Sequence, residues 1–382
     1  MSGSEQKYHH LVPKCYLSAW AEGNGTLLLE NLKSGKVSPG NKGNHFGMKR
    51  FYSIEAGMPF CTYSDAEQFF ACLSDCKVEY GGRSIDDLLE LNSLYYDFDN
   101  WIITRSDGRR ESSKKIKEQI NKVHLLDIED GWAAQVEDGW PKIVNQLETV
   151  ALSADEGLIP EFKQEEVTRF CVVQDWRTMS SSDALNSAFD WLDDYVLGGL
   201  LERINIPEGE RRFPAFGTAK DELKHEFLLS SYRKYQNGSG PIEDEILDCL
   251  EHASFDLVTA KGPRFFITSD NPSFVMKGDG AKERLMAVSP RLLLRQVRDR
   301  GISGQYNVVH ASLEQVDELN SKIRRKARNL LVLPHRSSFL LAVVARESAY
   351  APSYCSVWLR RSQQQRNSFL GFIGQGRRIS GR

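Results

Sequence analysis

The sequence predicts an α+β fold, in which a helical middle segment packs on a mixed or antiparallel sheet formed by N-terminal and C-terminal strands. Strand-like segments gather near residues 26–30 and again after Ser254, whereas helical patterns fill the region of about 64–252. Strands and helices are therefore segregated along the chain rather than alternating. No Gly-rich loop follows a strand, which disfavours dinucleotide-binding and P-loop folds.

The N-terminal segment combines a short helical turn with one strand. Pro13 begins the turn, and apolar residues follow it at helical spacing. Thr26–Glu30 comes after a Gly-Asn-Gly turn and reads as a strand. The stretch Val37–Phe46 is rich in Gly and Asn and predicts a loop. Phe51–Ser53 ends this first unit.

The middle of the chain predicts a succession of helices. A capping box at Ser64–Glu67 predicts a helix that runs to about Tyr80, and a shorter helix is expected over Ser84–Phe98. The clearest helical pattern covers Glu161 to about Ser180. The other helices expected are Lys114–Leu126, Trp140–Leu152, Asp183–Ile204, Asp221–Tyr235 and Ile242–His252.

The C-terminal part predicts strands and one long helix. Phe255–Thr259 and Arg264–Thr268 read as two strands joined by a Lys-Gly-Pro turn. A capping box at Ser312–Gln315 predicts a helix that runs to about Leu330. Further strands are expected over Leu285–Val288, Leu292–Val297, Ser338–Ala345 and Ser356–Leu359. We expect one α+β domain over residues 1–336 and a C-terminal strand extension with a basic tail over 337–382.

The composition is that of an ordinary folded protein. The chain has 382 residues, of which 41% are hydrophobic and 26% charged, and its net charge is -3. This charge disfavours an obligate duplex DNA or RNA partner, although a local basic patch can still bind nucleic acid. No apolar run approaches the roughly 20 residues that span a bilayer, and the N-terminus has no apolar leader. Together with seven scattered cysteines, these features predict a cytoplasmic protein without a membrane partner.

The first candidate motif is the adjacent pair His9 and His10, followed by Leu-Val-Pro. It resembles the start of His-metal-finger nucleases, in which a neutral imidazole takes a proton from water beside a divalent metal. Such nucleases also need an Asn and a His on a following helix, but Asn41, Asn44 and His45 lie in a predicted loop. The alternative is structural, with His10 forming hydrogen bonds in the first turn.

The second motif is the turn Ser269-Asp270-Asn271-Pro272 at the end of an apolar strand. A carboxylate in such a position can project beyond the sheet edge and serve as a metal ligand or a general base. The alternative is that Asp and Asn before Pro simply form a tight turn, and the spacing alone favours this structural role.

The third motif lies on the long predicted helix, where Gln174 and Arg177 are three residues apart and share one face. An Arg directed among apolar neighbours needs a partner, which could be an anion or Asp270. The favoured alternative is an internal salt bridge to a helix carboxylate.

The fourth motif is a basic run over Lys322–Arg328, in which Lys322, Arg325 and Lys326 face together on the predicted helix. A solvated helix face is its usual meaning, and a surface that follows phosphates is the sharper alternative. The remaining histidines have no metal-ligand spacing, and these are His124, His225, His252, His310 and His335.

Several short motifs occur together in one order along the chain. They are His9-His10-x-x-Pro13-x-x-Tyr16-Leu17, Phe51-Tyr52, Arg177-Thr178, Ser269-Asp270-Asn271-Pro272, Ser289-Pro290, and Asn320 with Ala327. In this pattern the chain resembles the bacterial domain-of-unknown-function family numbered four-two-three-eight, over about residues 8–335. The resemblance implies one domain that contains both the His segment and the Asp-Asn-Pro turn. Lys14 stands where the family often has Gln, so an amide has no role there.

The leading functional hypothesis is a hydrolase, a metal-assisted phosphodiesterase or nuclease, with a role as a bacterial defence effector or toxin. Its base would be His10, and Mg²⁺ or Mn²⁺ would bind Asp270 and His10. His9 and Asn271 would assist. The residues expected to contact substrate are Lys14, Tyr16, Gln174, Arg177 and Arg325. The partner would be a nucleic acid or a nucleotide.

Two alternatives stay open. One is a non-catalytic sensor or binding module for an anionic or nucleotide ligand. The other is a structural or partner-binding protein, with a protein partner or a second copy of the chain. Metal content and activity on RNA and DNA separate the hydrolase from both alternatives.

Overall fold

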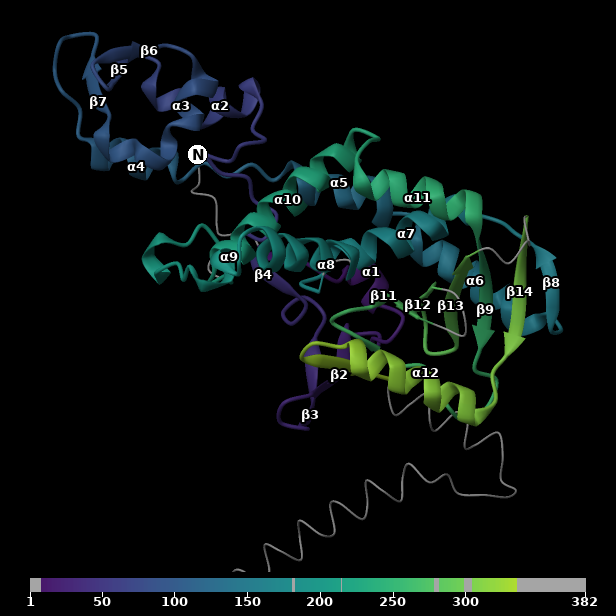
Figure 1. Cartoon of the computed structure of the whole chain (residues 1–382). Coiled ribbons are helices and arrows are strands. Elements are labelled where there is room, and N and C mark those ends of the chain that lie inside the picture. Colours follow the sequence, from purple (N-terminus) through teal and green to yellow (C-terminus); the bar gives the residue numbers. More distant parts are fainter. Residues whose placement is uncertain (1–7, 181–182, 214, 278–281, 299–303, 335–382) are drawn as a thin grey trace, which may run out of the picture. The chain divides into compact units, whose positions relative to one another are not determined.

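A computed structural model describes residues 8–180, 183–213, 215–277, 282–298 and 304–334 (Figure 1). All of them fall in one compact unit over residues 1–335. Helices combined with mixed and antiparallel sheets confirm the α+β class. The strands expected over Ser338–Ala345 and Ser356–Leu359, and the tail over 337–382, lie outside the described residues.

The largest sheet has six strands in the order β11-β12-β13-β9-β14-β8. The strands are β8 (Gly157–Pro160), β9 (Ala253–Thr259), β11 (Ser273–Lys277), β12 (Lys282–Ala287), β13 (Leu292–Arg298) and β14 (Gln305–His310). The β14–β9 pair is parallel and the other pairs are antiparallel, so the sheet is mixed. Every residue of β9 is buried, since this strand lies between two others and contacts helices of the middle segment.

N-terminal and C-terminal strands meet in a separate four-stranded sheet, in the order β10-β15-β2-β3. The strands are β2 (Thr26–Asn31), β3 (Val37–Asn41), β10 (Thr268–Ser269) and β15 (Leu330–Leu333). The loop expected over Val37–Phe46 is thus partly a strand. The strand expected over Phe255–Thr259 lies within β9, but of the strand expected over Arg264–Thr268 only Thr268 is in a strand, and β9 and β10 belong to different sheets.

Helices fill the middle of the chain, as predicted. The α-helices that precede residue 160 are α1 (Lys14–Leu17), α2 (Tyr63–Phe69), α3 (Leu88–Ser93), α4 (Ser113–Ile120), α5 (Asp127–Trp132) and α6 (Trp140–Ser153). Those after it are α7 (Gln164–Arg177), α8 (Asp183–Trp191), α9 (Leu200–Arg203), α10 (Ala219–Gln236), α11 (Pro241–His252) and α12 (Leu313–Lys326). The predicted box of Ser312 and Gln315 does cap α12, which ends four residues before Leu330.

One part of the middle differs from the prediction of two helices over about 64–98. A three-stranded antiparallel sheet forms there from β5 (Cys76–Tyr80), β6 (Arg83–Ile85) and β7 (Ile102–Arg105). The physical cause is the Gly81-Gly82 pair, whose φ angles of 59° and 82° suit the tight turn that joins twisted strands. The capping box of α2 is formed by Thr62 and Asp65, two residues before the predicted one.

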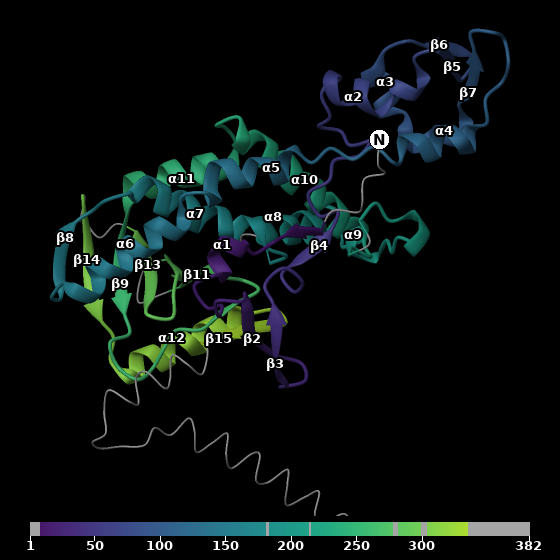
Figure 2. The ribbon, with the colours of Figure 1, turned by 180° about the vertical axis from the view of Figure 1, so that it is seen from behind.

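Helix α7 lies against α11 and strand β11 (Figures 1 and 2). Its residues pack into two hydrophobic cores. Phe170 and Cys171 pack in the core of the six-stranded sheet, whereas Val172, Val173 and Trp176 pack in the core formed with α10 and α11. A helix covered on all sides needs no polar face, which explains why every residue from 170 to 177 is buried. The C-terminal end of α7 therefore carries Arg177 into the interior. Within the described residues, no helix is long and apolar enough to cross a membrane.

Candidate functional site

The two adjacent histidines lie on β1 (Tyr8–His10), which pairs antiparallel with β4 (Gly47–Lys49). Side chains alternate along a strand, so His9 is buried and His10 lies half-buried on the other face. Gly47 lies opposite His10, and a Cβ there would come 2.2 Å from the His9 carbonyl oxygen. Only glycine allows this close approach of the two strands.

His9 fastens the N-terminal segment to the interior. Its Nδ1 accepts a hydrogen bond of 2.7 Å from the backbone N–H of Tyr52, and the two rings stack at 5.6 Å. The Tyr52 hydroxyl in turn donates to the carbonyl oxygen of Arg177 at 2.9 Å. The motif pair Phe51-Tyr52 is thus the link between β1 and α7.

His10 has a different environment. Its Nε2 lies 3.2 Å from the carbonyl oxygen of Gly43, a group that only accepts, so Nε2 donates and the neutral ring leaves Nδ1 unprotonated. Burial lowers the pKa of His10, and the charge of nearby Lys14 lowers this pKa further. The backbone N–H of His10 faces Glu129 Oε1 at 3.5 Å. His10 is therefore neutral near pH 7 and can accept a proton at Nδ1.

Arg177 is 1% exposed and lies beside two carboxylates. Its Nη1 donates to Glu137 Oε1, and its Nη2 lies 3.9 Å from Glu129 Oε2. The guanidinium also lies over the rings of Tyr52 and Trp132, at 5.7 and 5.3 Å from their centroids. The partner of Arg177 is thus an internal carboxylate and not Asp270, in agreement with the alternative of an internal salt bridge.

The two carboxylates differ in their chemistry. Burial raises the pKa of Glu129, against the opposing effect of Arg177, so its protonated form persists above the usual range. Glu137 is the last residue of a π-helical turn over Ala133–Glu137, a distortion that is frequent at functional sites. Cys15 Sγ lies 3.9 Å from Glu137 Oε2, and burial raises the pKa of this thiol to about 12. Cys15 is therefore an inert thiol, and the groups suited to proton transfer are His10 and Glu129.

The Asp-Asn-Pro turn fastens the end of α12. Both oxygens of Asp270 accept backbone N–H groups, from Arg328 at 2.9 Å, Asn329 at 2.8 Å and Leu330 at 3.1 Å. Burial raises the pKa of Asp270, and these donors oppose that effect. The Asp270 carboxylate is thus engaged by the backbone.

Asn271 connects the same turn to α7. Its Nδ2 donates to the carbonyl oxygen of Lys326 at 3.1 Å, and its Oδ1 accepts from the Thr178 hydroxyl at 3.2 Å. Thr178 follows Arg177 directly, so the second motif reaches the His10 region through the end of α7. Within the described part of the chain, no hydrogen bond or ion pair joins His10 to Asp270.

The other residues expected to contact substrate lie in varied surroundings. Tyr16 is buried, and its hydroxyl bonds to Thr268 and Ala287. Gln174 is fully buried, and its amide atoms have no hydrogen-bond partner among the described residues.

Two cationic candidates remain at the surface. Lys14 is exposed near His10, and Arg325 is exposed on α12. Two other residues of the basic run are paired with carboxylates. Lys322 pairs with Glu318, and Arg324 pairs with Glu30, so part of the run is neutralised.

Sequence reasoning missed Glu129 and Glu137. An inward Arg on α7 requires a carboxylate, but the chain offers 52 acidic residues and no local pattern that selects these two. Their selection comes from tertiary structure: the π-helical turn packs against α7, and α5, which contacts that turn, brings Glu129 within 3.9 Å of Arg177. Across the described ranges, no group of three or more His, Cys, Asp or Glu side chains is placed to hold a metal ion.

The comparisons with known proteins agree with the placement of both motifs in one unit. The model of the family described as "Protein of unknown function (DUF4238)" matches residues 8–337. This range contains the His9-His10 strand, the end of α7 and the Asp270 turn. No curated protein and no solved structure matches the chain. Since the family model covers most of the sequence, the chain belongs to the DUF4238 family.

Proposed function

We propose that this protein is a hydrolase of phosphodiester substrates, with His10 as the general base and Glu129 as the general acid. The observation that carries the proposal is the pairing of a neutral imidazole, unprotonated at Nδ1, with a carboxyl group of raised pKa whose Oε1 lies 3.5 Å from the His10 backbone nitrogen. Burial favours the neutral form of both groups, which is the form that a general base and a general acid each need before the reaction.

Hydrolysis needs a base that removes a proton from water and an acid that gives a proton to the leaving oxygen. His10 Nδ1 would remove a proton from water as the water oxygen forms a bond to phosphorus. The bond from phosphorus to the leaving oxygen would break, and the carboxyl proton of Glu129 would pass to that oxygen. Lys14, exposed beside His10, would attract the single negative charge of the diester. Arg177 would act as a positioning residue, because its guanidinium holds both carboxylates.

Metal assistance by Mg²⁺ or Mn²⁺ stays a prediction. Asp270, the carboxylate first expected to hold the ion, binds three backbone N–H groups. Glu137, which pairs with Arg177 near His10, would hold the ion in its place, because Glu129 must keep its proton to act as the general acid. In that case a bound ion would lower the pKa of the attacking water.

A non-catalytic module for an anion or a nucleotide is the second candidate. It is favoured by the exposed ammonium of Lys14 beside the half-buried His10, because a cation and a hydrogen-bonding ring can hold an anion without turnover. A site of this kind would bind its ligand at Lys14 and His10 without turnover.

The test measures cleavage of RNA, of single-stranded DNA and of bis(p-nitrophenyl) phosphate, with EDTA, Mg²⁺ or Mn²⁺. We expect His10→Ala and Glu129→Gln to lower the rate by about 100-fold or more, the usual contribution of general acid–base catalysis. The controls are His45→Ala and Glu67→Gln, which change exposed residues of the same types and should keep full activity.

The outcomes separate the candidates. A wild-type protein that cleaves none of these substrates under any metal condition overturns the hydrolase proposal. If it instead binds a nucleotide, and folded His10→Ala loses that binding, the non-catalytic module is supported. Dependence of cleavage on Mg²⁺ or Mn²⁺ would assign the metal role.

A further inference from the structure

A polar cavity of about 200 Å³ lies beside the N-terminal end of α10, and none of the residues discussed above for catalysis lines it. Its walls come from α8, α9 and α10. The lining residues are Asn186, Phe189, Asp190, Glu202, Thr218, Lys220, Asp221 and Lys224. It is smaller than the roughly 300–1,000 Å³ of pockets for drug-sized ligands, so its volume suits a molecule of few heavy atoms.

Most charges around the cavity are paired with one another. Lys220 Nζ lies 2.8 Å from Asp190 and 3.4 Å from Glu202. Asp221 Oδ2 accepts the hydroxyl of Thr218 at 2.9 Å, and the Asp221 backbone N–H donates to Thr218 Oγ1. These contacts cap α10 and fasten it to α8 and α9. Of the two lysines that line the cavity, they engage Lys220 and leave Lys224 without an ion pair among the described residues.

The remaining cation is Lys224. Its ammonium donates to Asn186 Oδ1, but no described carboxylate forms an ion pair with it. The Asn186 amide is itself oriented, because its Nδ2 donates to the carbonyl oxygen of Ser180 at 2.6 Å. Burial lowers the pKa of Lys224, the carboxylates of Asp221 and Asp190 oppose this effect, and the positive charge of Arg328 adds to it.

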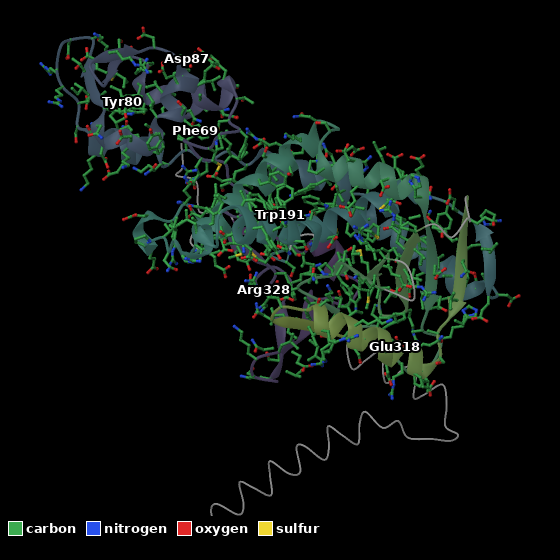
Figure 3. All side chains as sticks on the ribbon, in the orientation of Figure 1. Phe69, Tyr80, Asp87, Trp191, Glu318 and Arg328 are labelled. Atoms are coloured by element: carbon green, nitrogen blue, oxygen red, sulfur yellow. The ribbon has the colours of Figure 1, made fainter. Side chains whose placement is uncertain are left out.

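Arg328 adds positive potential to the same region. It follows α12 and is exposed (Figure 3). Among the described residues its side chain forms no ion pair. A half-buried ammonium that has only a neutral amide as partner gains free energy when an anion binds, since a charge-assisted hydrogen bond is stronger than a neutral one.

We propose that this cavity binds a small organic anion, whose charged group contacts Lys224 and whose apolar part packs against Phe189. A carboxylate and a phosphate monoester share the required chemistry. The site is independent of His10 and Glu129, so either proposal can fail without the other.

The test uses three probes on the full chain: benzoate, phenyl phosphate and the neutral amide benzamide. Binding is measured by isothermal titration calorimetry. We expect benzoate or phenyl phosphate to bind the wild type at least tenfold more tightly than benzamide, because only an anion pairs with the ammonium. The stronger of the two anions identifies the charged group that the cavity prefers.

Two variants each make the cavity more negative by one charge, by different routes. Lys224→Met removes the cation and keeps an apolar stem, and Asn186→Asp supplies an internal carboxylate to Lys224. We expect each to weaken anion binding at least tenfold. The control is Lys234→Met, an exposed lysine further along α10 that lies outside the cavity, and it should bind as the wild type does.

Circular dichroism spectra show whether each variant is folded. The test needs only one of Lys224→Met and Asn186→Asp to be folded. Anion binding that persists in a folded Lys224→Met or Asn186→Asp variant overturns the proposal. So does a wild type that binds benzoate and phenyl phosphate no more tightly than benzamide.

Discussion

The Tyr16 hydroxyl oxygen lies 2.5 Å from Thr268 Oγ1, although 252 residues separate the two in the sequence. The single hydroxyl hydrogen of Tyr16 goes to the carbonyl oxygen of Ala287, so Thr268 donates to the Tyr16 oxygen. This contact joins the segment that follows His9 and His10 to the strand that precedes the Asp270 turn. It is one of the contacts, together with a shared hydrophobic core, that hold the two motifs in one unit.

Tyr16→Phe should destabilise the protein by about 2–3 kcal/mol, because it leaves buried partners at Thr268 and Ala287 without a hydrogen bond. Urea denaturation followed by circular dichroism measures the change in the free energy of unfolding. A double-mutant cycle with Thr268→Val isolates the pair, and we expect the two losses to be less than additive. Strict additivity would mean that the two hydroxyl groups do not interact.

Asp270→Ala should lower the free energy of unfolding by about 2–4 kcal/mol, because three backbone N–H groups after α12 lose their charged acceptor. Asp270→Asn keeps one acceptor oxygen, so its decrease in the free energy of unfolding should be smaller. Thermal unfolding, together with metal titration of each variant, provides the measurement. If Asp270→Ala kept its thermal stability but lost metal binding, the carboxylate would be a metal ligand rather than a cap.

The fold class could be predicted because segregation of strands and helices is visible in local periodicity. Local signals also gave the position of α12, whose capping residues Ser312 and Gln315 act within one turn. The pairing of β10 with β15 and the parallel pairing of β9 with β14 could not be predicted, since both join distant segments. The Gly81-Gly82 pair is a local signal for the hairpin of β5 and β6, although the sequence pattern around it predicts two helices.

The candidate site was predicted in part. The inward direction of Arg177 could be inferred, because apolar residues surround it in the sequence of α7. Its partners could not, since Glu129 and Glu137 reach it only through the packing of a different segment. Asn271 binds a backbone group at the end of α12, and Asp270 binds one just after it. These contacts could not be predicted, because the position where α12 ends depends on tertiary structure.

The hydrolase should have a bell-shaped dependence of kcat/KM on pH, with an acidic limb set by His10 and an alkaline limb set by Glu129. The base must be unprotonated, and the pKa of His10 lies below its usual value near 6.5, so the acidic limb falls below that pH. The acid must be protonated, and the pKa of Glu129 lies above its usual 4.5, so activity declines as pH rises through that raised pKa.

Glu129→Gln is the variant that assigns the alkaline limb. It should retain only residual activity, and that residual activity should no longer fall as pH rises through the raised pKa of Glu129. Initial rates between about pH 4 and pH 9 provide the profile. A wild-type rate that climbs continuously to alkaline pH would exclude Glu129 as the acid.

Acid should destabilise the protein through His225, which is buried in contact with the rings of Phe51, Phe213 and Phe216. Its Nε2 donates to the Phe51 carbonyl oxygen at 2.8 Å, and burial lowers the pKa of His225 to about 3. An unfolded His has a pKa of about 6.5. The unfolded chain therefore binds the extra proton between these values, and stability present above pH 6.5 is lost as pH falls toward 3, by about 1.4 kcal/mol per pH unit at most.

His225→Phe should remove this contribution, because phenylalanine fits the aromatic cluster and carries no titratable group. We expect it to cost about 1 kcal/mol at pH 7 through the lost hydrogen bond, yet to make the free energy of unfolding depend less steeply on pH below 6.5. Urea denaturation of the wild type, His225→Phe and the exposed control His45→Phe, at several pH values, measures the slopes. If His225→Phe retained the wild-type slope, the acid sensitivity would belong to other groups, because the buried neutral imidazole is the feature that links His225 to pH.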